Sequence, residues 1–137
     1  MHLHFLCQKP QSMDLRDTRF VIALIYEAFD RIVNISHFDY VVLAKQHDRL
    51  VGCAVLTEYT HYVLIQCLCV LSSQRKQGIG EAVLSYIRHE FEPKQLVLEV
   101  NSGATHDRLV RFYERNGFRI CFRSACETRL CSCDVAG

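Results

Sequence analysis

Six residues between a long apolar run and an amphipathic segment have the composition of a phosphate-binding loop. They read Arg75-Lys76-Gln77-Gly78-Ile79-Gly80. The first N–H groups of a helix have no partner within the helix, and its dipole favours negative charge there. Gly78 and Gly80 have no Cβ to keep a pyrophosphate from the backbone, and Arg75 and Lys76 add positive charge. The sequence therefore predicts an anion-binding loop; the alternative is a glycine-softened helix start with solvated basic side chains.

The segments on either side of this loop predict how it is held. Residues 62–71 contain one plainly polar side chain, Gln66, which is typical of a strand buried on both faces. Apolar residues then recur at helical spacing from Ile79 to Phe91. A strand thus leads through the loop into a helix. The glycine spacing fits neither a Walker loop nor a Rossmann fingerprint, so those two nucleotide sites are excluded.

Two blocks of the sequence resemble the GNAT superfamily of N-acetyltransferases. The first, Arg75-x-x-Gly78-x-Gly80 after a strand, is similar to the family motif Gln/Arg-x-x-Gly-x-Gly/Ala. The second, at residues 112–118, reads Phe-Tyr-Glu-Arg-Asn-Gly-Phe and is similar to the family's Leu-Tyr-Glu-x-x-Gly-Phe. The resemblance implies an acyltransferase that moves the acetyl group of acetyl-CoA to a primary amine by direct attack in a ternary complex. The amine would be a small amine, a polyamine, or a lysine or N-terminal amine of a protein.

The resemblance gives catalytic roles to two side chains. It implies that Tyr113 is the general acid for the departing thiolate, and a phenol with a reference pKa of about 10 suits a thiol of about 8.5. Some family members use a glutamate of the preceding strand as base, which here is Glu99, with Glu58 in reserve. Each residue also has a purely structural interpretation, which stays open. Tyr113 would then only pack beside Phe112 and Leu109, and Glu99 would be an ordinary glutamate on a half-exposed strand face.

The resemblance also implies a set of acetyl-CoA contacts. Backbone N–H groups around Leu68–Val70 would stabilise the oxyanion. His106 stands where the family often has an asparagine that contacts pantetheine, and it either donates a hydrogen bond in its place or faces solvent. The predicted contacts are Leu68, Cys69, Val70, Arg75, Lys76, Gln77, Gly78, Ile79, Gly80 and His106.

Acidic residues predict where a cationic amine would approach. In the family the acceptor surface includes the first helix and the linker after it; here these carry Glu27 and Asp30, and Glu58 ends a later strand. The alternative for each is an ordinary solvated surface. A second function class also stays open, a non-catalytic acyl-CoA-binding module that senses the cofactor or contacts a partner.

The periodicities predict one α/β domain over 1–137, with a mixed, mostly antiparallel sheet flanked by helices in the order β-α-β-β-β-α-β-α-β-β. A linker or short helix is expected at 31–38 and a loose tail at 132–137. The expected strands are 2–7, 40–45, 50–58, 62–71, 95–101, 118–123 and 127–131, and the expected helices are one around Val21–Phe29, 78–91 and 105–116. The resemblance implies, in addition, that the fourth and fifth strands splay apart where pantetheine inserts.

Composition narrows the function class further. Sixteen Lys and Arg against fifteen Asp and Glu give no basic field for nucleic acid. The eight cysteines contain no Cys-x-x-Cys pair, so we expect buried thiols of a reduced protein rather than disulfides or a metal site, with Cys131-x-Cys133 left open for redox or metal chemistry. No secretory signal or membrane-spanning run is seen, which predicts a cytoplasmic protein, with the nucleus left open. A monomer or a homodimer is expected, with no nucleic-acid or membrane partner.

Overall fold

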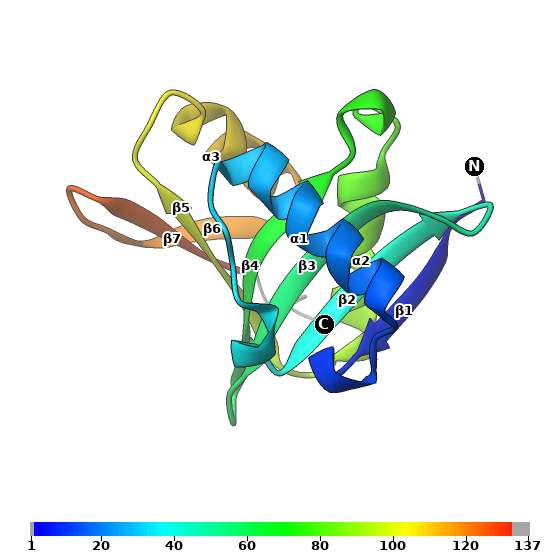
Figure 1. Ribbon diagram of the computed structural model, residues 1–137. Coiled ribbons are helices and arrows are strands. Elements are labelled where there is room, and N and C mark those ends of the chain that lie inside the picture. The colour runs from blue at the N-terminus through cyan, green and yellow to red at the C-terminus, as the bar shows by residue number, and fades with distance from the viewer. Residues whose placement is uncertain (1, 133–137) are drawn as a thin grey trace.

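The computed structural model describes residues 2–132, which form a seven-stranded sheet with helices on both faces (Figure 1). The order of the elements confirms the predicted one, and the linker at 31–38 contains a single short 3-10 turn. The strands are β1 His4–Gln8, β2 Tyr40–Gln46, β3 Arg49–Glu58, β4 Tyr62–Val70, β5 Gln95–Asn101, β6 Phe118–Arg123 and β7 Glu127–Ser132. The helices are α1 Leu15–Phe29, α2 Ile79–Glu90 and α3 His106–Arg115, and the 3-10 turns are η1 Pro10–Ser12, η2 Ile35–His37 and η3 Ser72–Gln74.

Within residues 2–132 the strands are arranged β1-β2-β3-β4-β5-β7-β6, and only β4 and β5 pair in parallel. A parallel pair needs a crossover between its strands, and here α2 supplies it. Helix α1 packs on β3 and β4 from one face, while α2 packs on β2 to β4 and α3 on β5 and β6 from the other. The sequence places the anion-binding loop between β4 and α2, so the sheet fixes where that loop lies.

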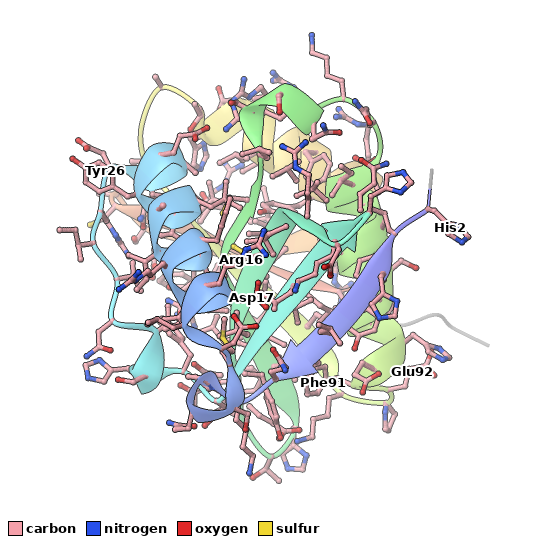
Figure 2. The ribbon with its side chains drawn as sticks, turned by 45° about the vertical axis from the view of Figure 1, so that its right-hand side comes forward. His2, Arg16, Asp17, Tyr26, Phe91 and Glu92 are labelled. Atoms are coloured by element: carbon pink, nitrogen blue, oxygen red, sulfur yellow. A yellow bond between two sulfur atoms is a disulfide. The ribbon has the colours of Figure 1, made fainter. Side chains whose placement is uncertain are left out.

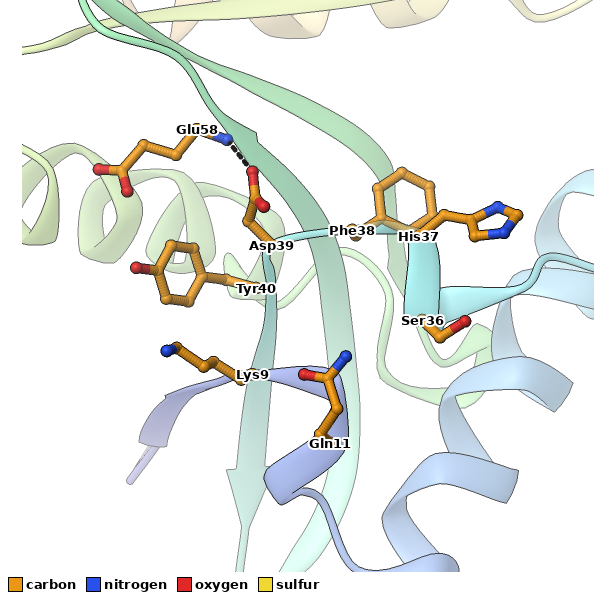
Figure 3. A pocket seen from close by; sticks show the side chains of 8 residues that line it. All are labelled: Lys9, Gln11, Ser36, His37, Phe38, Asp39, Tyr40 and Glu58. Carbon is orange, nitrogen blue, oxygen red and sulfur yellow. Dashed lines mark hydrogen bonds between the residues drawn. The ribbon is translucent and has the colours of Figure 1, made fainter.

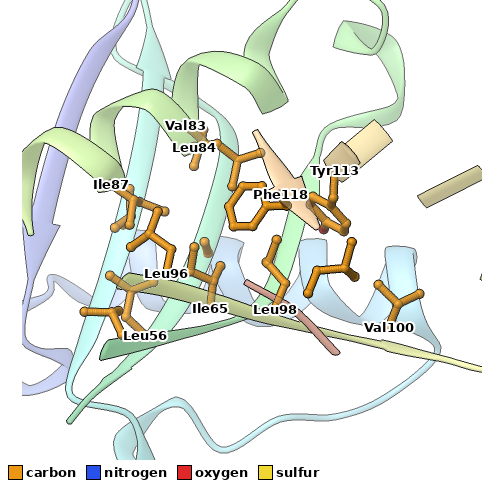
Figure 4. Close-up of a cluster of buried hydrophobic side chains, with 14 of the residues drawn as sticks. Leu56, Ile65, Val83, Leu84, Ile87, Leu96, Leu98, Val100, Tyr113 and Phe118 are labelled. Atoms are coloured by element: carbon orange, nitrogen blue, oxygen red, sulfur yellow. The ribbon is translucent and has the colours of Figure 1, made fainter. Parts of the chain in front are cut away.

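Two buried apolar clusters hold these layers together. On the α1 face, Val21, Leu24 and Ile25 of the helix pack on alternate residues of β2 and β3. The larger cluster lies under α2 and α3, and Figure 4 shows helix side chains such as Leu84 and Ile87 meeting the inner face of β5. Because β3 is buried on both faces, it reads as an almost unbroken apolar run.

One cysteine pair corrects the expectation from spacing. Cys121 of β6 and Cys131 of β7 form a disulfide, so the prediction that disulfides are disfavoured is wrong for this pair. A register irregularity between Ile120 and Phe122 takes Cys121 out of the regular ladder and brings it beside its partner. Cys53 and Cys69 are buried free thiols, as predicted. Of the Cys131-x-Cys133 pair, Cys133 lies outside the described residues.

Candidate active site

Strands β4 and β5 separate partway along their length. They pair from Tyr62 with Gln95 to Ile65 with Leu98, and beyond that point β5 pairs only with β7. Strand β4 continues to Val70, bonded to β3 alone. In the described part of the chain, the β4 backbone after Ile65 therefore has no partner strand on its β5 side. This is the opening that the family resemblance implies between the fourth and fifth strands.

The exposed edge of β4 begins at a β-bulge. Cys67 and Leu68 together lie opposite the single β3 residue Ala54. Cys67 has a φ of 53°, in the left-handed region that residues other than glycine seldom adopt. A bulge bends the strand and turns its backbone groups away from the ladder. The predicted oxyanion donors around Leu68–Val70 thus follow directly on a bulge at the opening.

The predicted anion-binding loop joins this edge to α2. In the structure of residues 2–132, no hydrogen bond uses the N–H groups of residues 76–81, and the first helical bond runs from Ala82 N to Gly78 O at 3.0 Å. The side chains of Arg75, Lys76 and Gln77 are exposed. Six unpaired N–H groups with two cations beside them match the chemistry of a phosphate cradle.

Two contacts fix the position of the loop. Arg75 Nε donates to Val70 O at 3.3 Å, which ties the loop to the end of β4. The Ile79 side chain is buried under α2, where it contacts the glycine of β3, Gly52. Ile79 can therefore meet a cofactor through its N–H group only.

Glycine is required at positions 78 and 80 for two different structural reasons. Gly78 has a φ of 77° as it caps α2, a conformation that costs glycine little. At Gly80, a Cβ would lie 3.2 Å from Phe112 Cζ, so its missing side chain lets α2 and α3 pack closely. Gly78 shapes the cradle, and Gly80 sets the distance of α3 from it.

Tyr113 extends from α3 toward the opening. Its ring lies edge-on to those of Phe112 and Phe118, and its residue is only 7% exposed (Figure 4). Burial raises the pKa of Tyr113 well above its ordinary value, and the nearby Cys69 thiol adds to the rise. Tyr113 belongs to the same buried cluster as Leu98 and Val100, the β5 residues at which that strand leaves β4, so its side chain lies near the opening. Tyr113 therefore stays protonated, but its raised pKa makes proton transfer to a thiolate less favourable than the reference pKa of a free phenol predicts.

The free energy of unfolding is expected to fall as the pH rises above about 9. Burial raises the pKa of Cys7 to about 11, and it also raises the pKa values of Cys67, Tyr86 and Tyr113. In the unfolded chain thiols and phenols ionise at their ordinary values of 9.0 and 10.0, so above these values the unfolded state loses protons that the folded state keeps. Urea unfolding between about pH 8 and about pH 10.5 tests this, and an unchanged midpoint would contradict it.

Glu99 lies on the opposite face of β5 from Tyr113. Leu98 and Val100 belong to the same buried cluster as Tyr113, and strand side chains alternate between faces. On the other face, Arg129 Nη2 donates to Glu99 Oε1 at 3.1 Å from the cross-strand position on β7. The Glu99 side chain is 26% exposed. It is thus a half-exposed carboxylate paired with a cation rather than an isolated buried acid.

Arg129 is a candidate site residue that the sequence analysis missed. Its pairing with Glu99 depends on the register of β5 against β7, which the sequence does not reveal. The guanidinium also lies over the Phe122 ring, 5.7 Å from its centroid, and 3.8 Å from Glu127 Oε1. These contacts hold the charged end of Arg129 at the Glu99 face.

His106 is mostly buried and has a hydrogen-bond partner at each ring nitrogen. Its Nε2 lies 2.7 Å from Thr128 Oγ1 and its Nδ1 lies 2.9 Å from Asp107 Oδ1, and the side chain is 20% exposed. The hydrogen bond to His106 lowers the pKa of Asp107. Thr128 pairs with Val100 across β5 and β7, so His106 anchors the start of α3 to the strands at the opening.

The predicted acceptor residues Glu27 and Asp30 lie at the C-terminal end of α1. Both are exposed, and Asp30 ends α1 with a φ of 54°. Ala28 and Val33, on either side of Asp30, pack in the same cluster as Cys67 of the β4 bulge. The chain after α1 therefore packs on the same apolar cluster as Cys67 of the bulge.

Glu58 lies elsewhere. It pairs with Val63, at the hairpin end of β4, about 16 Å of strand length from Leu68. Lys94 Nζ donates to Glu58 Oε2 at 3.0 Å. Figure 3 shows Glu58 at the rim of a polar hollow of about 450 Å³, where its N–H bonds Asp39. The structure brings Tyr113 and Glu99 to the two faces of the opening and leaves Glu58 apart from both.

Comparison with known proteins decides which family has this site. Residues 37–120, more than half of the chain, match the sequence profile of the acetyltransferase (GNAT) domain. The chain belongs to the GNAT acetyltransferase family. This confirms the resemblance carried by the Arg75–Gly80 and 112–118 blocks, and with it the prediction of an acyltransferase. A search of curated protein sequences finds no match.

Solved structures share the fold of this GNAT domain. An acyl-CoA N-acyltransferase from Pseudomonas aeruginosa superposes with a TM-score of 0.77 at 15% identity, over 96% of this chain and 100% of that one. A GNAT family acetyltransferase from Elizabethkingia anophelis, with acetyl-CoA bound, superposes with a TM-score of 0.73 at 19% sequence identity, over 95% of this chain and 97% of that one. Escherichia coli ElaA superposes with a TM-score of 0.72 at 15% sequence identity, over 96% of this chain and 99% of that one. None of the helices between residues 2 and 132 has the length and apolar character needed to cross a bilayer.

Proposed function

We propose that this GNAT domain transfers the acetyl group of acetyl-CoA to a primary amine by direct attack in a ternary complex. The observation that carries the proposal is the juxtaposition of the β4–β5 opening with the six unpaired N–H groups at the start of α2. Arg75 links the two features through its bond to Val70 O. The acetyl-CoA bound to the Elizabethkingia anophelis relative supports the same donor here.

The donor side of the site consists mainly of backbone. The N–H groups of residues 76–81, with Arg75 and Lys76, would hold the pyrophosphate. The pantetheine arm would lie in the opening along β4, past His106 at the start of α3. Backbone N–H groups around Leu68–Val70 would then stabilise the carbonyl oxygen as it gains negative charge. These groups have no partner because β5 leaves β4 after Ile65, and the extra residue of the bulge at Cys67 changes which of them point toward the opening.

The two proton transfers take place on opposite faces of β5. The amine attacks from the Glu99 face, where the carboxylate accepts its proton directly or through one water. As the new N–C bond forms and the C–S bond breaks, Tyr113 on the other face donates its proton to the departing sulfur. Glu99 and Tyr113 then return to their starting states by proton exchange with solvent.

Initial rates measured over a grid of acetyl-CoA and amine concentrations test the order of events. Direct attack predicts double-reciprocal lines that intersect, since both substrates must be bound before any product leaves. Parallel lines would show an acetylated enzyme and overturn the proposal. Acetyl-CoA binding without turnover on any amine would instead support the non-catalytic binding module.

Glu99→Gln is expected to lower kcat about tenfold and to weaken the rise of the rate with pH, because the variant loses a proton acceptor on the amine side. The matched control is Glu127→Gln, which removes the other carboxylate near Arg129, 3.8 Å from its Nη2. The control should keep the wild-type pH–rate profile. If both variants behave alike, the role of Glu99 is only to balance the charge of Arg129.

A further inference from the structure

The end of α1 and the residues after it expose three large apolar side chains. Tyr26 is 51% exposed, Phe29 is 39% exposed and Ile32 is 83% exposed. Tyr26 and Phe29 lie on one side of the last helical turns, and Figure 2 shows Tyr26 pointing outward from that end of α1. We call Tyr26, Phe29 and Ile32 the apolar rim. Exposed apolar groups that gather in this way mark a binding surface more often than solitary ones do.

The apolar rim is continuous with the proposed acceptor mouth. Ala28 and Val33, within and just beyond the rim, pack in the cluster that contains Cys67 of the β4 bulge. Arg31, inside the rim segment, is close enough to Cys67 to offset part of the rise that burial causes in the Cys67 pKa. The rim segment therefore packs on the same apolar cluster as the bulge, and its larger side chains stay exposed outside that cluster.

The charge beside the apolar rim favours a cation. Glu27 and Asp30 alternate with the rim residues along the chain, both are exposed, and among residues 2–132 neither forms an ion pair. Arg31 offsets one of these two charges, so the segment from Tyr26 to Ile32 carries a net charge of −1. Carboxylates at the mouth of a cleft raise the local concentration of positively charged ligands. A linear polyamine would use this charge and leave the apolar rim in water.

We propose that the acetyl acceptor is a primary amine with a bulky apolar or aromatic group within a few bonds of its nitrogen. The inference rests on the proposed function and narrows it. The apolar group packs on Tyr26, Phe29 and Ile32, while Glu27 and Asp30 attract the ammonium form. The ammonium releases one proton to solvent, and the neutral amine then attacks the thioester and gives its second proton to Glu99. An arylalkylamine has both features in one small molecule.

The test compares 2-phenylethylamine with spermidine as acceptors at saturating acetyl-CoA. The proposal predicts that kcat/KM for 2-phenylethylamine is at least about tenfold higher, because only this amine buries apolar surface on the rim. Ile32→Ser and Phe29→Ser should each raise KM for 2-phenylethylamine about tenfold and leave the dissociation constant of acetyl-CoA unchanged. Ile32 lies outside any helix or strand, so its variant should fold normally.

The matched control is Leu15→Ser. Leu15 is also a large exposed side chain of α1, at 64%, but it lies at the first residue of the helix, fourteen positions before Phe29. This variant should keep the wild-type KM. Efficient acetylation of spermidine with poor use of 2-phenylethylamine, or rim variants that match the control, would overturn the inference and leave the proposed function standing. Acetylation of no amine by a protein that binds acetyl-CoA would overturn both.

Discussion

Tyr113→Phe is expected to lower kcat roughly a hundredfold and to leave the affinity for acetyl-CoA unchanged. The hydroxyl group supplies the proton for the departing thiolate, whereas the ring packs with Phe112 and Phe118, and phenylalanine keeps that packing. Because burial holds the pKa of Tyr113 high, the wild-type rate should show no decline at alkaline pH that is due to this residue. Steady-state kinetics and calorimetric titration with acetyl-CoA measure the two effects separately.

The matched control for this variant is Tyr86→Phe. Tyr86 is another tyrosine whose pKa is raised chiefly by burial, but it lies on α2, stacked on Phe5 at 4.8 Å, away from the opening. Its loss should leave kcat unchanged. If Tyr113→Phe turns over as fast as Tyr86→Phe, Tyr113 is a packing residue and another group or water protonates the thiolate.

Gly78→Asp is expected to weaken acetyl-CoA binding roughly a hundredfold relative to Gly78→Asn at low salt. Both side chains tolerate the positive φ of 77° better than most, so the pair differs mainly in one negative charge. That charge would stand at the cradle of unpaired N–H groups, where it repels the pyrophosphate and competes for the same donors. Calorimetric titration of both variants with acetyl-CoA gives the ratio of their dissociation constants.

Salt provides the internal check on this prediction. The gap between Gly78→Asp and Gly78→Asn should narrow as ionic strength rises, because salt screens charges at an exposed loop. Equal affinities at low salt would refute the assignment of residues 76–81 to the pyrophosphate. Gly80→Asp would be a poorer probe, since its Cβ would press on Phe112 and disturb α3 as well.

The features predicted correctly from the sequence are local along the chain. The alternation from apolar strand to glycine loop to amphipathic helix is present in consecutive residues, and it predicted the loop between β4 and α2 and the order of the elements. The family blocks added the β4–β5 opening, which no periodicity would reveal. Gly80 was interpreted only as access for phosphate, because its contact with Phe112 joins two helices that are distant in sequence.

The features that were missed depend on strand register. The ion pair of Glu99 with Arg129 joins β5 to β7, and the disulfide of Cys121 with Cys131 joins β6 to β7. A one-residue change in the register of either strand pair would abolish the contact. The same limit applies to Glu58. The sequence places it at the end of a strand, but only the topology shows that this is the end remote from the opening.

The most direct test of acetyl transfer is to quantify both products in one reaction of the purified protein with carbonyl-labelled acetyl-CoA and a mixture of primary amines. Thiol titration gives the CoA released, and mass spectrometry gives the labelled acetylated amine. The proposed function predicts equal amounts of the two, with both lost in Tyr113→Phe far more than in Tyr86→Phe. Release of CoA without an acetylated amine, or binding of acetyl-CoA without either product, would contradict it.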